Sequence, residues 1–322
     1  MHTFPATPSG QSCQKNSARQ FGPAPIIPSP RWDQARRWVS KLALCTLGLV
    51  LTAALGGCST VRLAYGQAPT LAYWWMDDFV DLSDAQSSVL RKDIDAFFAW
   101  HRSEELPLYA ERLKQWQTMA TQDTTGEHSC QQLDVVLAAY QRSAERSIQP
   151  LTRLAVGLKP DQLQHLVRHY AKSNRKFADE WLDDGVQARK ERLFDKTLDR
   201  YETLYGTLSQ PQRTLLKVRT DASAFDPQRM QVERQRRQTD LLATLKQAQA
   251  QPAEAANLLR QWHARALNSP DASYAAYAKV VMRQGCDQYA ALHNTTSPEQ
   301  RAHAVGVLKG YETDLLALTR PD

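Results

Sequence analysis

Four long stretches of this 322-residue chain begin with nearly the same short phrase, which constrains the fold more than any other feature. A serine is followed three residues later by a glutamine at Ser83-x-x-Gln86, Ser209-x-x-Gln212 and Ser297-x-x-Gln300. Such pairs are capping boxes, in which each side chain satisfies a backbone N–H group at the start of a helix. A fourth phrase, Lys159-x-x-Gln162, lacks the hydroxyl. Because the separations are 76, 50 and 88 residues, the phrases do not read as copies of one repeated unit.

Apolar residues at spacings of three and four follow these starts, the pattern of a helix with one face packed on others. Leu133, Val136, Leu137 and Tyr140 begin one such stripe, which we expect to face the core. Glycine and β-branched residues are sparse in these stretches, and no clear run of strands is present. The chain is therefore predicted to be all-α, a long multi-helix bundle of about seven helices.

The boundaries of the predicted helices follow from proline, glycine and polar residues. Pro107 should bend the first long helix, and Asp183-Asp184-Gly185 is a weak point in the third. A break at 221–226 leaves open a division into two lobes. Trp74 and Trp75, in a short first helix, are expected either to pack beneath the first long helix or to lie at lipid headgroups. The helices are expected at about 71–80, 83–120, 129–155, 158–208, 208–245, 252–267, 269–289 and 297–315.

A secretory signal precedes the helical part. Arg36, Arg37 and Lys41 provide its basic region, and residues 42–55 form an apolar run without a charged side chain. This run is shorter than the roughly 20 residues of a transmembrane helix. It ends at Leu55-Gly56-Gly57-Cys58, which resembles the lipobox of bacterial lipoproteins. The resemblance implies that the cysteine thiol receives a diacylglyceryl group, that the signal is removed before it and that the new amino terminus is acylated.

The lipobox divides the chain into a leader and a mature protein. Residues 1–57 are predicted to be a disordered leader and cleaved signal peptide, 58–70 a lipid-anchored connector, and 71–322 the helical domain. Ser59 follows the cysteine where the family's inner-membrane retention signal places aspartate. The resemblance therefore implies the periplasmic face of the outer membrane. The alternative is a Gly-Gly-Cys sequence at the end of an uncleaved anchor helix.

The net charge of +6 belongs mostly to the leader. Residues 1–57 hold six of the 40 basic residues and one of the 34 acidic residues, so the mature part has 34 basic and 33 acidic residues. A nearly neutral domain does not have the basic surface that nucleic-acid binding needs. The charged run at 233–238 is predicted to be a solvated helix face. We therefore expect no nucleic-acid partner.

The five cysteines have different fates. Cys13 and Cys45 leave with the leader, and Cys58 is the predicted lipidation site. Cys130 and Cys286 remain as an isolated pair, in a compartment where disulfides persist. We predict a disulfide between them, and the alternative is two unpaired buried thiols that pack as small apolar residues.

Two groups of residues follow Cys58: Trp75-x-x-Asp78-x-Val80-Asp81-Leu82 and Trp100-His101-Arg102-x-x-Glu105-Leu106-Pro107-x-Tyr109. They resemble an uncharacterised family of Gram-negative envelope lipoproteins, most clearly over residues 58–116. This resemblance implies a helical envelope protein and brings no established activity. The four capping phrases are also similar to the Leu-Thr-x-x-Gln signature of small periplasmic stress proteins and chaperones, whose helices cradle unfolded clients. Serine replaces the threonine here.

No pattern of residues predicts an active site. His165 and His169 are four residues apart, but the glutamate of the metalloprotease HExxH motif and a third ligand are missing. His101 with Glu104 and Glu105 has groups for acid–base chemistry, yet adjacent positions on a helix point apart, and Arg102 offers simple ion pairs. Nucleotide-binding and hydrolase motifs are not found. We therefore expect no catalytic residue, no metal site and no cofactor.

Three functions follow, in order of preference. The first is a non-enzymatic lipoprotein, held at the membrane through the lipid on Cys58, that binds a protein or an envelope component. The second is a chaperone-like or stress-related factor that holds unfolded clients. The third is an envelope hydrolase. An apolar helix surface open to solvent would favour the second, and carboxylates converging in a cleft would favour the third.

Overall fold

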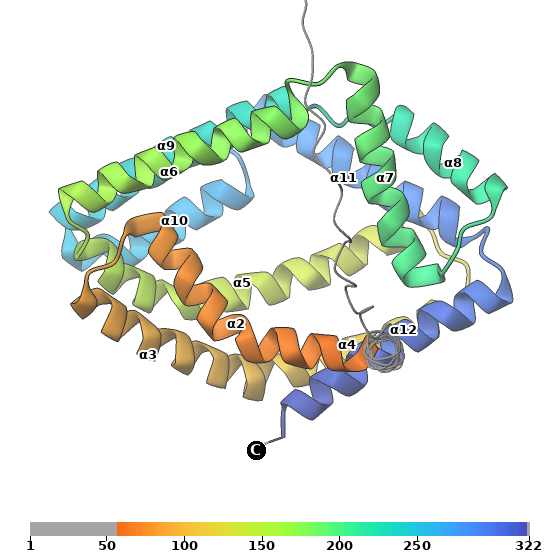
Figure 1. Ribbon diagram of the computed structural model, residues 1–322, viewed down its shortest axis with the longest axis horizontal. Helices are drawn as coiled ribbons and strands as arrows, with labels where there is room; N and C mark the ends of the chain where they lie inside the picture. Colours follow the sequence, from red (N-terminus) through yellow and green to blue (C-terminus); the bar gives the residue numbers. More distant parts are fainter. Residues whose placement is uncertain (1–56, 321–322) are drawn as a thin grey trace, which may run out of the picture. The chain divides into compact units, whose positions relative to one another are not determined.

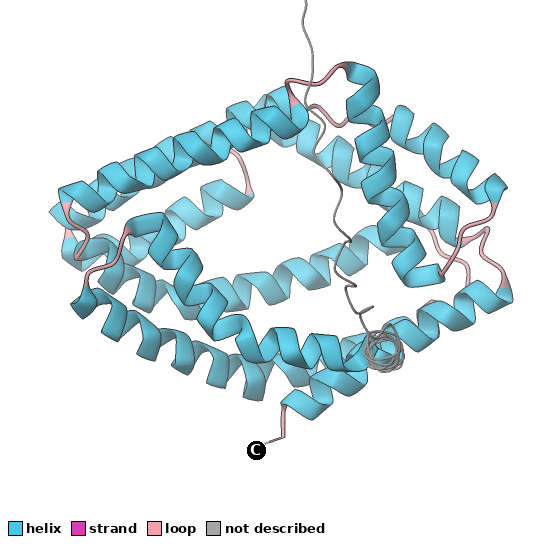
Figure 2. Ribbon diagram, in the orientation of Figure 1, coloured by secondary structure: helices cyan, strands magenta, loops and turns pink. Residues whose placement is uncertain are grey.

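The stretches predicted to be helical are helices in the computed structural model, which describes residues 57–320, with side chains from residue 60 onward (Figure 1). Short loops join them, and Figure 2 shows no strand in this part of the chain. The all-α prediction is therefore confirmed. The predicted leader and signal peptide, with Cys13 and Cys45, lie outside the described residues, as does the side chain of Cys58.

The helices are shorter and more numerous than predicted. The third predicted helix is interrupted between Trp181 and Val186, at the expected weak point, and the fourth between Asp221 and Pro227. None of the described helices is long and apolar enough to cross a membrane. The α-helices are α2 (Gly57–Val80), α3 (Asp84–Trp100), α4 (Leu106–Met119), α5 (Gly126–Val156), α6 (Pro160–Trp181), α7 (Val186–Tyr205), α8 (Gln210–Asp221), α9 (Pro227–Ala250), α10 (Ala255–Leu267), α11 (Ala272–His293) and α12 (Pro298–Leu318). A π-helix (His101–Glu105) joins α3 to α4, and a 3-10 turn (Pro252–Glu254) precedes α10.

The predicted connector at 58–70 is helical, because α2 runs without interruption from its first residue to the loop before α3. Contacts with distant residues explain the difference from the prediction. The guanidinium of Arg62 pairs with the carboxylate of Asp314 on α12 at 3.1 Å. The hydroxyl of Tyr65 forms a hydrogen bond of 2.9 Å with Nδ1 of His101. The local sequence gives no sign of these partners.

Two of the capping glutamines meet at one end of the described unit and form what we call the first lock. Within its own box, Gln86 accepts the backbone N–H of the N-cap through Oε1. Its Nε2 then donates to the carbonyl of Gly157 at 2.9 Å. Gln162 in turn donates to the carbonyls of Asp81 and Val80 at 2.9 and 3.1 Å. The amides of Gln86 and Gln162 also contact each other, with an Nε2–Oε1 distance of 2.8 Å.

The other two capping glutamines form a second lock in the same way. Gln212 donates to the carbonyl of Thr295 at 3.0 Å, and Gln300 donates to the carbonyl of Thr207 at 3.1 Å. Their amides are also mutually hydrogen-bonded, at 2.8 Å. In both locks each glutamine reaches the carbonyl two residues before the N-cap of its partner box. The boxes thus work as two equivalent pairs, which their unequal spacing in the sequence had concealed.

Each lock covers a hydrophobic core. Leu158, next to the first lock, packs in a core with Leu166 of α6 and Leu245 of α9. Leu208, next to the second lock, packs in a core with Leu216 of α8. In Figure 1, α6 and α9 lie side by side at one edge, and α8 and α12 lie towards the opposite side. The break between α8 and α9 falls at the predicted position, and the described residues on both sides of it belong to one compact unit.

Candidate functional site

An apolar groove of about 800 Å³ runs between α4 and α5 and is open to solvent. One wall carries Leu108 and Trp116 of α4, and the other carries Val136 and Tyr140 of α5. Val136 and Tyr140 are 50% and 51% exposed. Large apolar side chains are costly to leave in water when they are contiguous, so such a surface marks a binding site. We call this feature the α4–α5 groove.

The α5 wall of the groove belongs to the stripe that was predicted to face the core. That prediction is wrong for the first half of α5, where Leu133 and Leu137 are also exposed. In the second half it is right, because Ile148 and Ala155 are buried against α9 and α10. Of the helices that cover the second half, α10 reaches as far as Tyr140, whose ring centroid lies 5.5 Å from that of His263, whereas Val136 and Leu137 stay exposed. The first half keeps an apolar face without a cover among the described residues.

A polar cluster lies at one end of the α4–α5 groove. Glu105, only 2% exposed, accepts hydrogen bonds of 2.7 and 2.8 Å from Nε and Nη2 of Arg142. These bonds hold the pKa of Glu105 below its usual range, although burial acts in the opposite direction. Burial also lowers the pKa of His101, which bonds to Tyr65 rather than to a carboxylate. A general acid needs a raised pKa, so this arrangement suits a fixed ion pair better than acid–base chemistry.

The residues of the polar cluster come together through the π-helix. A π-helix inserts one extra residue per turn and occurs often at functional sites. Here it begins at His101 and ends at Glu105. The sequence suggested Arg102 as the partner of Glu105, whereas the structure assigns Arg142 of α5 to it. Only the fold reveals this partner, because the two residues are 37 positions apart.

The two histidines four residues apart on α6 both face Asp78 of α2. His165 Nε2 lies 2.9 Å from the backbone carbonyl of Asp78, and His169 Nδ1 lies 3.4 Å from its carboxylate. The ring of His169 also packs on Phe79, with ring centroids 4.0 Å apart. Among residues 57–320, no group of three or more metal-ligating side chains converges. The histidines therefore join α6 to α2.

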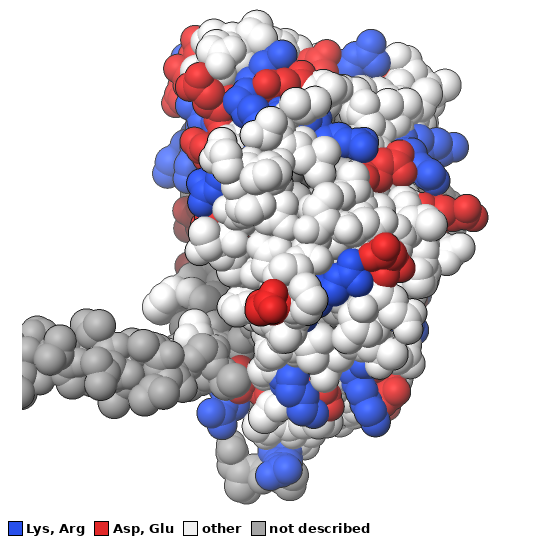
Figure 3. Space-filling model, turned by 90° about the vertical axis from the view of Figure 1, so that its right-hand side faces the viewer, with Lys and Arg blue, Asp and Glu red and all other residues white. Residues whose placement is uncertain are grey.

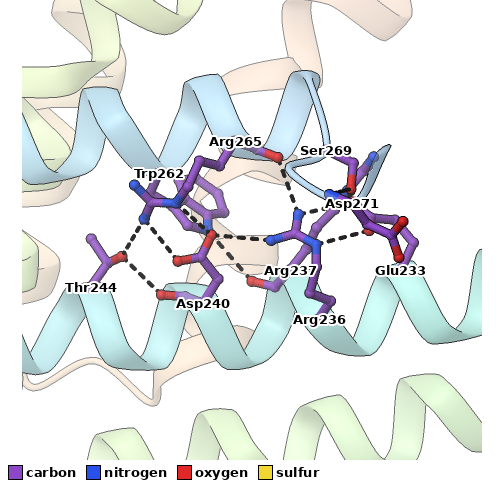
Figure 4. Close-up of polar contacts among 9 residues, drawn as sticks. All are labelled: Glu233, Arg236, Arg237, Asp240, Thr244, Trp262, Arg265, Ser269 and Asp271. Carbon is purple, nitrogen blue, oxygen red and sulfur yellow. Dashed lines mark hydrogen bonds and ion pairs between the residues drawn. The ribbon is translucent and has the colours of Figure 1, made fainter. Parts of the chain in front are cut away.

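The charged run on α9 is not the solvated face that its composition predicted. Figure 4 shows that its side chains connect α9 to α10. Glu233, 3% exposed, accepts hydrogen bonds from Arg236 at 2.8 Å and Arg237 at 2.7 Å. Asp240 likewise accepts from Arg265 of α10 at 2.8 Å. Burial acts to raise the pKa of Glu233, but the hydrogen bonds from its partners outweigh it and lower that pKa to about 2.

Cys130 of α5 and Cys286 of α11 lie at disulfide distance, with their sulfur atoms 2.09 Å apart and their Cα atoms 5.4 Å apart. The pair joins the uncovered half of α5 to the rest of the unit. Two hydrogen bonds of 2.9 Å between Thr124 and Asn294 tie the preceding loop to the end of α11. These contacts position the α5 wall of the α4–α5 groove. Cys58, the predicted lipidation site, is the second residue of α2.

Comparison with known proteins gives a family without an assigned role. A family model described as a family of unknown function (DUF6279) matches residues 78–271. No curated protein and no solved structure matches the chain. The matched segment contains the first lock, the π-helix and the α4–α5 groove. The prediction that the chain is a helical member of an uncharacterised family is therefore confirmed.

Proposed function

Since this chain belongs to the DUF6279 family of unknown function, we propose a role from its geometry: it is a lipid-anchored binding protein that holds apolar segments of unfolded polypeptides in the α4–α5 groove. It is held at the periplasmic face of the outer membrane through a lipid on Cys58. The observation that carries this proposal is the half-exposed apolar face of α5. It is the open apolar helix surface that would favour a chaperone-like role over other binding roles.

The dimensions and the edges of the α4–α5 groove support a peptide ligand. Helical proteins bind extended or helical segments by burying apolar side chains in such grooves. Its charged lining residues are Glu111 and Arg112 of α4 and Arg142 of α5, and most of its other lining residues are apolar. One face of the described unit is largely uncharged, with acidic and basic residues scattered over it (Figure 3). A surface of mixed charge suits clients of varied sequence better than a polyanion.

An envelope hydrolase and a purely structural protein have less support. The one deeply buried carboxylate beside the α4–α5 groove, Glu105, is neutralised by Arg142 and has a lowered pKa. A hydrolase would need a protonated acid or a free base at that position. A purely structural role would not explain why α5 exposes an apolar face to solvent. The capping glutamines support the chaperone-like role further, because they resemble the Leu-Thr-x-x-Gln phrase of periplasmic chaperones.

The groove is tested by suppression of aggregation. A soluble form of residues 59–322 should suppress the aggregation of a chemically denatured client at a stoichiometric ratio, measured by light scattering. Val136→Glu should require an about tenfold higher concentration for the same effect, because the client would bury an unpaired carboxylate. Val218→Glu is the matched control, since Val218 is 61% exposed on α8, away from the groove. No suppression by the parent, or equal loss in both variants, would contradict the proposal.

The anchor is tested separately. Cells that express the full chain with Cys58→Ala should incorporate no fatty-acid analogue into the protein, whereas the parent should be labelled, because the thioether to the diacylglyceryl group needs this thiol. The labelled protein is measured by gel fluorescence after purification. Cys130→Ala serves as the control for loss of a thiol elsewhere and should label normally. Labelling of the Cys58→Ala variant would overturn the lipoprotein assignment.

A further inference from the structure

We propose that a second cavity, between α2, α6 and α9, binds a single-chain amphiphile whose anionic headgroup pairs with Arg234. The cavity has a volume of about 550 Å³, within the range of about 300–1,000 Å³ for small-molecule sites. It shares no lining residue with the α4–α5 groove. It is therefore an independent site, and the proposal does not rest on the chaperone-like role.

The walls of this cavity suit an alkyl chain. Most of the lining is apolar and includes Phe79 of α2, Leu166 and Tyr170 of α6, and Leu241 and Leu245 of α9. The polar lining comes from α9 and comprises Arg234, Gln238 and the ion-paired Glu233 and Arg237. These side chains extend the hydrophobic core beneath the first lock. An alkyl chain gains free energy from contact with such walls without needing a specific geometry. The walls therefore favour a ligand whose apolar part is an alkyl chain.

Arg234 assigns the charge of the headgroup. Its Nε donates to Oδ1 of Asn174 at 2.9 Å, and its Nη2 donates to Oγ of Ser173. Both partners are neutral, and no carboxylate of residues 57–320 forms an ion pair with Arg234. Arg234 is partly exposed and lines the cavity, and a guanidinium that is held only by neutral partners favours an anion with two acceptor oxygens.

The neighbouring arginines differ from Arg234 in this respect. Arg236 and Arg237 both have Glu233 as a partner, and Arg265 has Asp240 (Figure 4). Their guanidinium groups are therefore engaged in fixing α9 to α10. Arg234 is held in place by neutral side chains instead, with its charge available. On α9, Arg236 and Arg237 pair with a carboxylate and stabilise the fold, whereas Arg234 has neutral partners and is the arginine that we assign to the ligand.

The mouth of the cavity carries an exposed tryptophan. Trp75 lines the cavity, is 59% exposed and packs on Phe79 with ring centroids 4.4 Å apart. Trp74 beside it is also 59% exposed, so the expectation that this pair packs beneath the first long helix is wrong. Tryptophan is the side chain best suited to the boundary between apolar chains and water. An amphiphile would enter along this edge with its headgroup last.

The test uses the lipid-free form, residues 59–322, and measures binding by calorimetry and tryptophan fluorescence below the concentration at which each ligand aggregates. Oleate should bind saturably with one site per chain, and oleyl alcohol, which has the same chain without the charge, should bind about tenfold more weakly. Oleate and oleoyl-lysophosphatidylglycerol have the same acyl chain and each carry one negative charge, on a carboxylate and on a phosphodiester respectively. Whichever binds more tightly identifies a free fatty acid or a phospholipid as the source.

Variants of Arg234 connect this binding to the assigned residue. Arg234→Gln should reduce oleate affinity to that of oleyl alcohol, whereas Arg234→Lys, which keeps the charge but not the two-donor geometry, should restore it in part. Arg219→Gln, a change of the same charge at an exposed position of α8, should bind oleate normally. Equal affinities for oleate and oleyl alcohol, or unchanged oleate binding by a folded Arg234→Gln variant, would overturn the proposal. Because Val136→Glu leaves this cavity intact, failure here is distinguishable from failure of the α4–α5 groove.

Discussion

The free energy of unfolding should fall by about 4 kcal/mol when Cys130 and Cys286 are both replaced by alanine. The sulfur atoms join residues separated by 156 positions, so a bond between them removes much of the conformational freedom of the unfolded chain. Alanine is preferred to serine because Cys286 is buried, and a hydroxyl there would add a separate penalty. Urea unfolding of the parent and the double variant measures the difference.

Reduction provides the control for this prediction. The parent protein with a reducing agent should become as unstable as the double variant, whereas the double variant should not respond. Hydrogen exchange should increase first at the start of α5, which the pair joins to α11. Two titratable thiols in unreduced protein, or equal stability with and without reductant, would show that the pair is not bonded.

The second large effect is expected from Arg142→Ala, which should lower the free energy of unfolding by about 3 kcal/mol. The change leaves the carboxylate of Glu105 buried without its partner. Arg146→Ala is the matched control, because Arg146 lies one turn further along α5 and its guanidinium lies over the ring of Trp100, 5.6 Å from the centroid, rather than on a carboxylate. Its loss should cost about 0.5–1 kcal/mol. Equal costs for the two variants would contradict a special role for the Glu105–Arg142 pair.

The loss of stability caused by Arg142→Ala should depend on pH. The pKa of Glu105 is lowered in the folded protein, chiefly by the hydrogen bonds from Arg142. Its contribution to stability is therefore complete above the unfolded pKa, near 4.5, and is lost as pH falls towards the folded pKa. In Arg142→Ala the buried carboxylate favours protonation instead, so the stability difference from the parent should shrink on acidification below about pH 5. Urea midpoints between pH 7 and pH 4 measure it.

Much of the fold could be predicted because the signal for the start of a helix lies within a few neighbouring residues. A capping box needs residues only three positions apart, and the breaks at 182–185 and 222–226 follow Asp and Gly signals in the same few residues. The pairing of the boxes could not be predicted in this way. The amide of Gln86 satisfies its own N-cap with its oxygen, and nothing local indicates where its nitrogen donates. The helical connector was missed for the same reason, since Arg62 and Tyr65 depend on distant partners.

The candidate site shows a different limit. The stripe that begins at Leu133 has the period of a packed helix face, and a period does not distinguish a partner in the same chain from one in another molecule. The composition of the charged run on α9 predicts a solvent-exposed face, whereas Glu233 is buried and paired with arginines of the same run. In both cases the sequence shows the pattern of residue types on the helix but does not show what surrounds those residues in the fold. Environment depends on which helices are long enough to cover which others.

The two locks have an electrostatic consequence. Each lock brings together the N-termini of two helices and the C-termini of the two helices that precede them. A helix carries about half a positive charge at its N-terminus and half a negative charge at its C-terminus, so the four ends at each lock sum to about zero. Salt screens net charges and leaves such a balanced junction largely unaffected. The ends of the unit should therefore stay closed at ionic strengths that loosen its exposed ion pairs.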